Sequence, residues 1–242
     1  MKIALVTGGS RGIGKAISVR LGSEGYYVIV NYRSNETEAK DTLEKIRSEG
    51  GEGELLRLDV SRAEEVNRVL DQWQNLNPEK QISILVNNAG VSKDNLMIFM
   101  SDQEWKDVMS TNLDSFFFVS RHLLKNMLVG KWGRIVNIVS LSGQKGLPGQ
   151  VNYSASKGAV IAATKALAME VGKKKVTVNA VAPGFIRTDM TKDMDEKQLS
   201  NLVPLRRFGE PEEVAEVVNF LVSDGASYIT GETISVNGGM YS

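Results

Sequence analysis

Three side chains in the second half of the sequence are suited to protonating a substrate oxygen. Tyr153 and Lys157 are four residues apart, so a helix places both on one face. An ammonium group beside a phenol stabilises the phenolate, which lowers the phenol pKa and makes the group a usable acid or base near neutral pH. Ser140 lies 13 residues before Tyr153, at the end of the apolar run 134–139. Since ligands gather at the carboxyl ends of strands in open α/β sheets, we expect Ser140 beside the same ligand. A Tyr-x-x-x-Lys pair also occurs by chance on many helices, so the interpretation depends on the rest of the chain.

A glycine-rich segment follows the first apolar run. Residues 3–6 lead into Gly8, Gly12 and Gly14, after which helical periodicity begins. Glycines let backbone amides approach a pyrophosphate, and a helix N-terminus favours negative charge. The spacing G-x-x-x-G-x-G differs from the common G-x-G-x-x-G fingerprint, and no Gly-Lys-Ser/Thr follows, which argues against a P-loop. We interpret the segment as a dinucleotide-binding turn, with a tight structural connection as the alternative.

The end of the second predicted strand bears on the choice of dinucleotide. Sites for NAD usually place Asp or Glu there to bind the ribose hydroxyls, whereas an Arg accommodates the 2′-phosphate of NADP. Here the strand ends in Asn31-Tyr32-Arg33-Ser34, with no carboxylate before Glu36. Arg33, with Ser34 and Arg11, could bind a phosphate group through charge-assisted hydrogen bonds. This pattern favours NADPH over NADH; the alternative is that Arg33 is a solvated surface charge.

Short Val- and Ile-rich runs alternate with segments of helical periodicity, which is typical of βαβ units around a parallel sheet. The predicted strands are residues 2–7, 26–32, 54–59, 82–86, 134–139, 176–181 and 233–236. The predicted helices are residues 12–24, 35–49, 62–76, 103–129, 152–173 and 211–223. The expected fold is a single-domain, Rossmann-like three-layer α/β/α sandwich over residues 1–242, with a parallel sheet of about seven strands.

Residues 187–210 interrupt this alternation before the last helix. The segment is polar and contains Met190, Met194, Leu199 and Leu202. A long insertion in a compact domain is usually a lid or a binding segment. These apolar side chains also need an apolar surface to pack against. We therefore predict a lid near the substrate, with a solvated surface loop as the alternative.

The composition excludes several kinds of chemistry. The 29 Lys and Arg residues balance 29 Asp and Glu residues, so there is no electrostatic footprint for nucleic acid or an anionic membrane. The absence of Cys rules out disulfides, thiol catalysis and thiolate metal sites, and a lone His122 makes a His-rich metal site or a Ser-His-Asp triad improbable. No metal is expected. The N-terminus has too few apolar residues for a signal peptide, so the expected location is the cytoplasm.

The order and spacing of these elements resemble those of the short-chain dehydrogenases/reductases along the whole chain. The residues that carry the resemblance are Thr7–Gly14, Asn87-Asn88-Ala89-Gly90, Asn112, Ser140, Tyr153, Lys157 and Pro183-Gly184. Within this family, Tyr228–Tyr241, Gly149–Tyr153 and Pro183–Met190 are most similar to the β-ketoacyl-[acyl carrier protein] reductases. The stretch from Met190 to Pro204 is shorter than in those enzymes by about one helical turn.

The resemblance implies a role for each matching residue. Tyr153 would donate a proton to the substrate carbonyl oxygen, and Ser140 would hydrogen-bond that oxygen; Ser142 is the less favoured candidate for this hydroxyl. Lys157 would lower the Tyr153 pKa, bind the nicotinamide ribose and join a water chain anchored by Asn112, whose alternative role is to kink its helix. The implied substrate contacts are Ser140, Ser142, Gln150 and Tyr153. The expected cofactor contacts are Gly8, Ser10, Arg11, Gly12, Ile13, Asn31, Arg33, Ser34, Asp59, Val60, Asn88, Ala89, Gly90, Tyr153, Lys157, Pro183, Gly184, Ile186 and Thr188.

The activity implied by the resemblance is NADPH-dependent reduction of a 3-oxoacyl thioester on acyl carrier protein to the 3-hydroxyacyl form. One alternative is reduction of a free ketone, sugar or polyol, and another is a non-catalytic NADPH-binding protein. Enoyl reductases of related fold separate Tyr and Lys by six residues, whereas three separate Tyr153 and Lys157, which argues against that reaction.

The resemblance also implies partners. Acyl carrier proteins are acidic, so Lys131, Arg134 and Lys173–Lys175 are candidate docking residues near the site entrance, although the three lysines are equally explained by a helix dipole. A homotetramer is implied, built through two helices and a C-terminal contact. The residues suited to close helix packing, there or within the chain's own core, are Phe116–Phe118, Gly158, Ala159, Ala162, Ala163 and Ala166.

Overall fold

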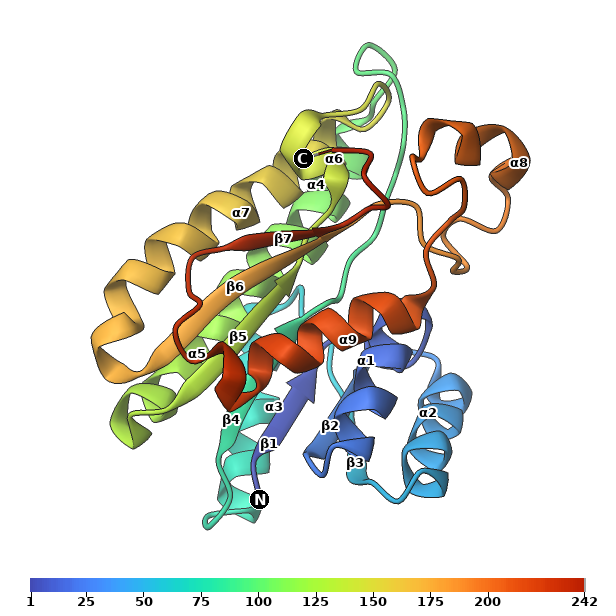
Figure 1. Cartoon of the computed structure of the whole chain (residues 1–242). Coiled ribbons are helices and arrows are strands. Elements are labelled where there is room, and N and C mark those ends of the chain that lie inside the picture. Colours follow the sequence, from blue (N-terminus) through green and yellow to red (C-terminus); the bar gives the residue numbers. More distant parts are fainter. Residues whose placement is uncertain (242) are drawn as a thin grey trace.

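The computed structural model describes residues 1–241 and contains a seven-stranded sheet in which neighbouring strands are all parallel. The strands are β1 (Ile3–Val6), β2 (Tyr27–Tyr32), β3 (Glu52–Arg57), β4 (Ile82–Asn87), β5 (Gly133–Ile138), β6 (Val176–Pro183) and β7 (Thr233–Val236). They lie in the order β3-β2-β1-β4-β5-β6-β7, with helices against both faces of the sheet (Figure 1). The predicted parallel, Rossmann-like α/β fold is confirmed.

Successive side chains of β1 point to opposite faces of the sheet, which explains the two layers of helices. Ala4 and Val6 belong to one buried apolar cluster, with side chains from α1, α2 and α9, whereas Ile3 and Leu5 belong to a second cluster, with side chains from α3, α5 and α7. A strand buried on both faces needs apolar residues at every position, and β1 has them. The helices are α1 (Gly12–Ser23), α2 (Glu36–Ser48), α3 (Ala63–Leu76), α4 (Asp102–Met109), α5 (Ser115–Gly130), α6 (Leu141–Lys145), α7 (Val151–Val171), α8 (Glu196–Leu199) and α9 (Pro211–Val222). Across residues 1–241, no helix combines the length and the apolar character needed to cross a membrane.

The helix predicted over 103–129 is interrupted. A π-helical turn, Ser110–Asp114, separates α4 from α5 and contains the buried Asn112. The two short helices α6 and α8 also went unpredicted, because neither is long enough to carry a periodic apolar pattern. π-Helical turns within α-helices are rare and are frequently found at functional sites.

The turn between β1 and α1 is packed directly against the end of β4. Because the strand order changes direction between these two strands, the crevice for a ligand opens beyond their carboxyl ends. Asn88 Nδ2 donates to the carbonyl oxygens of Thr7 and Gly8 at 2.9 and 3.0 Å. A Cβ atom on Gly14 would lie 2.1 Å from the Gly8 oxygen and 2.5 Å from Asn88 Nδ2. Only a residue without a side chain fits at Gly14.

We predict that Gly14→Ala destabilises the protein by about 2 to 3 kcal/mol, because the added methyl group overlaps fixed backbone. The midpoint of urea unfolding, at one protein concentration, measures the effect. Gly172→Ala is the matched control: Gly172 has helical dihedral angles and no atom within 4 Å of its Cβ position. That variant is expected to be neutral or slightly more stable. Equal midpoints for the two variants would contradict the assigned packing.

Candidate active site

A cavity of about 660 Å³ runs along the carboxyl edge of the sheet. Its size is within the range of small-molecule and cofactor sites. Every residue predicted to contact the cofactor lies in its wall, from Gly8 on the first turn to Thr188 beyond β6. Ser140, Tyr153 and Lys157 form another part of the same wall. Segments that are distant in the sequence therefore meet around one space, and their individual roles stay predictions.

The glycine-rich turn leaves its end of the cavity open to a ligand. Gly8 and Gly12 have φ angles of +60° and +50°, which L-residues with side chains rarely adopt. A Cβ atom on Gly12 would be 3.3 Å from Thr188 Cγ2, so the turn closely approaches the segment after β6. A group at the N-terminus of the 12-residue helix α1 would meet free backbone N–H groups, which suits a pyrophosphate.

Two predicted cofactor residues use their side chains to hold this turn. Asn31 is 2% exposed; its Oδ1 accepts from the Gly8 N–H at 3.0 Å, and its Nδ2 donates to the Leu58 carbonyl oxygen at 3.0 Å. Asn88 is bonded to Thr7 and Gly8, as described above. Both residues line the cavity, yet these side-chain groups are already engaged in shaping it.

The cavity wall at the end of β2 carries positive charge. Arg33 and Ser34 are exposed there, and the last residue of the strand is Tyr32, not an acidic residue. Arg11 faces the same space from the glycine-rich turn, where its Nη1 lies 3.9 Å from Asp189 Oδ2. Asp59, predicted to border an adenine, accepts hydrogen bonds from Ser61 through Oδ1, at 3.0 Å from the backbone N–H and 2.6 Å from the hydroxyl.

The catalytic candidates are fixed by local hydrogen bonds. Ser140 caps α6, and its Oγ accepts from the Ser142 N–H at 3.1 Å. With this lone pair occupied, the Ser140 hydroxyl proton is available to another acceptor. Lys157 Nζ lies 5.7 Å from the Tyr153 ring centre and donates to the Ile138 carbonyl oxygen at 2.8 Å. Tyr153 and Lys157 therefore share one face of α7, as their spacing indicates.

The protein groups do not produce the expected lowering of the Tyr153 pKa by Lys157. Burial raises the pKa of Tyr153 to about 12; the Ser140 hydroxyl lowers it, and the negative charge of Asp94 raises it. Burial lowers the pKa of Lys157 to about 8. An amine with this pKa exchanges protons near neutral pH, which suits a relay better than a fixed positive charge.

The side chain of Asn112 makes three hydrogen bonds. Its Oδ1 accepts from the Val91 N–H at 2.8 Å, while its Nδ2 donates to the Val91 carbonyl oxygen at 3.0 Å and to Ser156 Oγ at 3.1 Å. These bonds tie the π-helical turn to the segment after β4, which fits the structural role considered for Asn112.

Ser142 and Gln150 lie beside the cavity and not in its wall. Ser142 Oγ donates to Gln150 Oε1 at 2.7 Å, and Gln150 Nε2 donates to Asp94 Oδ2 at 2.6 Å. The sequence gives no signal for Asp94, because it is one acidic residue in an irregular polar segment. It enters the site only through contacts that the fold creates.

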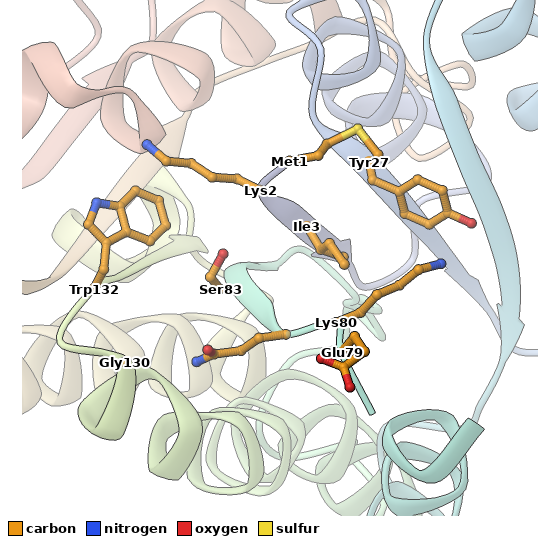
Figure 2. A pocket seen from close by; sticks show the side chains of 10 residues that line it. Met1, Lys2, Ile3, Tyr27, Glu79, Lys80, Ser83, Gly130 and Trp132 are labelled. Atoms are coloured by element: carbon orange, nitrogen blue, oxygen red, sulfur yellow. The ribbon is translucent and has the colours of Figure 1, made fainter. Parts of the chain in front are cut away.

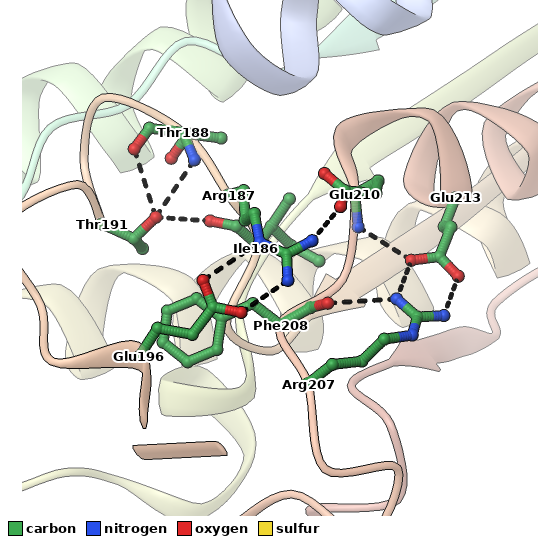
Figure 3. Close-up of polar contacts among 9 residues, drawn as sticks. All are labelled: Ile186, Arg187, Thr188, Thr191, Glu196, Arg207, Phe208, Glu210 and Glu213. Carbon is green, nitrogen blue, oxygen red and sulfur yellow. Dashed lines mark hydrogen bonds and ion pairs between the residues drawn. The ribbon is translucent and has the colours of Figure 1, made fainter. Parts of the chain in front are cut away.

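The segment predicted as a lid leaves the core through a narrow neck (Figure 3). Arg187 N–H donates to the Gly209 carbonyl oxygen at 2.9 Å, and Gly209 N–H donates to the Phe185 carbonyl oxygen at 2.8 Å. The rings of Phe185 and Phe208 stack at 5.1 Å. Arg187 also binds Glu196 at 2.5 and 3.0 Å and contacts Glu210. These charged contacts raise the pKa of Arg187 and hold α8 to the neck.

Some apolar side chains of the segment 187–210 are exposed, although Val203 and Phe208 are buried. Met190 is 54% exposed and Leu202 is 64% exposed, and Met190 borders the cavity. Exposed apolar side chains beside a cavity are suited to covering an apolar ligand.

The basic residues predicted near the site entrance are far from it within one chain. Lys131 ends α5 just before β5, and Lys173–Lys175 directly precede β6, so they lie at the amino edge of the sheet. Arg134 is only 3% exposed. Parallel strands place these residues at the edge opposite the cavity, so the predicted position is wrong for a single chain.

A second hollow, of about 550 Å³, lies at this amino edge (Figure 2). Lys2 Nζ lies 4.1 Å from the Trp132 ring centre, and Lys80 Nζ lies 4.9 Å from that of Tyr27. It contains neither the Ser-Tyr-Lys group nor the glycine-rich turn.

A doubly wound sheet with this turn and the Ser140, Tyr153 and Lys157 side chains on one cavity defines a nucleotide-dependent oxidoreductase. The family profile described as enoyl-(acyl carrier protein) reductase matches residues 8–241. Among similar proteins, the 3-oxoacyl-[acyl-carrier-protein] reductase FabG of Pseudomonas aeruginosa is 49% identical over 99% of this chain and 97% of its own length. FabG of Staphylococcus epidermidis is 44% identical over 99% of both chains, and the 3-oxoacyl-[acyl-carrier-protein] reductase of Synechocystis is 45% identical over 99% and 96%. The chain belongs to the short-chain dehydrogenase/reductase family of nicotinamide-dependent oxidoreductases.

The buried amine of Lys157 gives a testable effect on stability. The unfolded chain holds this proton up to a pKa near 10.5 and the folded chain only up to about 8, so the unfolded state binds more protons between these values. The cost of burying the ammonium is therefore complete below pH 8 and disappears above pH 10.5. We predict that Lys157→Met is more stable than the wild type at pH 7, by roughly 2 kcal/mol after loss of the bond to Ile138.

Denaturant unfolding of both proteins from pH 7 to pH 10.5 measures this difference, since the other ionisations are common to both and cancel. The advantage of Lys157→Met should shrink across this range as the wild type loses its buried charge. A difference that stays constant with pH would contradict the lowered pKa.

Proposed function

We propose that this protein reduces the ketone of a 3-oxoacyl thioester carried on acyl carrier protein, with NADPH as the reductant. The observation that carries the proposal is the position of Ser140 and Tyr153, two hydroxyl groups beside Lys157 on one cavity wall. The relatives at 44–49% identity that are named for this reaction support it. The product is the corresponding 3-hydroxyacyl thioester.

The residues fit a nicotinamide dinucleotide. The glycine-rich turn would hold the pyrophosphate, Asp59 and Val60 the adenine, and Asn88 to Gly90 the adjacent ribose. Pro183, Gly184, Ile186 and Thr188 would border the nicotinamide. When bound, the nicotinamide supplies the hydride that reduces the ketone carbon.

The protein's own part in the reaction is to supply and replace a proton. Tyr153 gives its hydroxyl proton to the substrate oxygen, while Ser140 donates a hydrogen bond that stabilises the developing negative charge. The raised pKa keeps Tyr153 protonated before the reaction. Lys157, with a pKa of about 8, can return a proton toward the phenolate at neutral pH. Residues 1–242 act as one domain in this proposal, with 187–210 as the lid over the acyl chain.

The name of the matching profile raises reduction of an enoyl group as a second possibility. Two observations favour the ketone. Ser140 and Tyr153 together present two donors to one oxygen atom, as a ketone needs. The 3-residue separation of Tyr153 and Lys157 also differs from the six-residue separation of the enoyl reductases.

A homotetramer is part of the proposal. Phe117, on α5, is 50% exposed, and Met169, on α7, is 87% exposed, so both helices present apolar groups to solvent. Ala162 and Ala166 are also exposed, as expected if small residues pack against another copy. Such an interface could bring the lysines at the amino edge of one chain closer to the cavity of its neighbour. Within one chain, Lys192 at the cavity and Lys197 on α8 are the nearer candidates for contact with an acidic carrier.

We predict that Tyr153→Phe reduces kcat/KM for a 3-oxoacyl thioester by about 10²- to 10⁴-fold, because the proton donor is lost. The NADPH dissociation constant should change little, since the ring and Lys157 remain. Initial rates of NADPH oxidation and a fluorescence titration measure the two quantities. Wild-type turnover in the variant would remove Tyr153 from the mechanism.

We predict that Arg33→Asp shifts the ratio of kcat/KM for NADPH and NADH by about tenfold or more toward NADH, because a phosphate contact is replaced by a carboxylate. Arg47→Asp is the control, since Arg47 is exposed in the last turn of α2 and lies outside the cavity wall. An unaltered ratio in Arg33→Asp would contradict a contact between Arg33 and the 2′-phosphate of NADPH.

A further inference from the structure

A chain of hydrogen bonds leads from the catalytic Ser140 to a carboxylate outside the cavity wall. The Ser142 N–H donates to Ser140 Oγ at 3.1 Å, and the Ser142 hydroxyl donates to Gln150 Oε1 at 2.7 Å. Gln150 Nε2 then donates to Asp94 Oδ2 at 2.6 Å. The other carboxylate oxygen of Asp94 accepts from the Ser92 hydroxyl.

The backbone around Asp94 is held against the helix that carries Tyr153. The Lys93 carbonyl oxygen accepts from Asn152 Nδ2 at 3.0 Å, and the Asn95 N–H donates to the Gly149 carbonyl oxygen at 2.8 Å. Asn152 is fully buried, and its Oδ1 accepts from the Tyr153 N–H at 2.7 Å. The backbone on both sides of Asp94 is thus attached to residues 149–152, which lie at the start of α7 and just before it.

The charge of Asp94 fixes the direction of every donor in this chain. A carboxylate only accepts, so Gln150 must turn its NH₂ group toward Asp94 and its oxygen toward Ser142. The Ser142 hydroxyl must then donate to Gln150, which directs its proton away from Ser140. Ser140 Oγ is the acceptor in its bond with the Ser142 backbone, so this bond does not use the Ser140 hydroxyl proton, which can be donated to the substrate oxygen.

We infer that Asp94 is a positioning residue of this active site: it orients Gln150 and Ser142 so that Ser140 acts as a donor to the substrate, and it places a negative charge near Tyr153. The inference rests on the proposed reduction of a ketone. It assigns Gln150 and Ser142 to this supporting chain in place of the direct substrate contact expected from the sequence.

The charged groups around Tyr153 support the inference that Asp94 acts on it through its negative charge. Arg11, Arg33, Asp59, Asp189 and Lys192 line the cavity, and Lys157 faces the ring from α7, yet the charge that acts on the Tyr153 pKa is that of Asp94, which raises it. Lys93, next to Asp94, is instead paired with Asp107 at 2.5 Å. A negative charge disfavours phenolate, so removing it should make Tyr153 more acidic.

Two substitutions separate the charge from the hydrogen bond. Asp94→Asn keeps an oxygen that accepts from Gln150 but removes the charge, whereas Asp94→Ala removes both. For Asp94→Asn we expect the alkaline limb of kcat/KM for ketone reduction to move to lower pH by roughly half a unit to one unit. For Asp94→Ala we expect the same shift and, in addition, a loss of about tenfold in kcat/KM, because Gln150 and Ser142 lose their fixed orientation.

Asp102→Asn is the matched control, because this exposed residue begins α4 and bears the same charge change without a contact to the chain of hydrogen bonds. Its pH profile should match that of the wild type. The ultraviolet absorbance of phenolate, taken as the difference between each protein and the same protein with Tyr153→Phe, measures the Tyr153 pKa without any substrate.

The two readouts distinguish this inference from the proposed function. A shifted phenolate titration in Asp94→Asn, from protein that reduces no 3-oxoacyl thioester, would support the inference and refute the substrate. Thioester turnover with an unshifted titration and an unshifted alkaline limb in Asp94→Asn would overturn the inference and leave the proposed reaction in place.

Discussion

The close approach of the first turn to the end of β4 is the constraint on which the rest of the structure depends. Gly14 must lack a side chain because the Gly8 carbonyl oxygen occupies that position, and Asn88 bonds the same backbone from the other side. This contact joins the two strands at which the sheet changes direction. The glycine-rich turn at the nucleotide end of the cavity is therefore a backbone surface that is fixed when the sheet forms.

On the other side of the sheet's centre, polar side chains of β4, β5 and α7 are bonded to one another. Asn87 Nδ2 donates to Asn137 Oδ1 at 2.9 Å, and Asn137 Nδ2 donates to Thr164 Oγ1 at 2.9 Å, which links two strands to the helix of Tyr153 and Lys157. Buried polar groups are costly unless they are bonded, so such a chain tolerates few alternative arrangements. These bonds connect the helix of the predicted catalytic residues to two central strands.

The parts of this molecule that follow from local pattern could be predicted from the sequence, and those created by tertiary contact could not. The strands are short apolar runs, and the glycine-rich turn and the Tyr153–Lys157 spacing are local signals. The π-helical turn at Asn112 depends on the Val91 backbone, 21 residues away, and Asp94 meets Gln150 only in the folded chain. The sign of the Tyr153 pKa shift depends on burial, which spacing alone does not specify. The lysines were placed at the wrong edge although the sequence shows that they directly precede predicted strands, which in a parallel sheet puts them opposite the carboxyl ends.

The neck at Ile186 and Gly209 makes the middle of the predicted lid largely independent of the packing of the sheet. The chain leaves and re-enters the core where Ile186 pairs with Gly209, and it makes a second contact after β7, where the Leu205 N–H donates to the Gly238 carbonyl oxygen at 3.2 Å and Val203 is buried. The residues before this second contact are mostly exposed. Lengthening such a closed loop costs only about 0.6 kcal/mol for each doubling of its length. Insertions, deletions or exchange of the segment between Lys192 and Ser200 would therefore change this border of the cavity while the glycine-rich turn, Ser140 and Tyr153 keep their places. The neck makes this region an exchangeable module on an otherwise fixed scaffold.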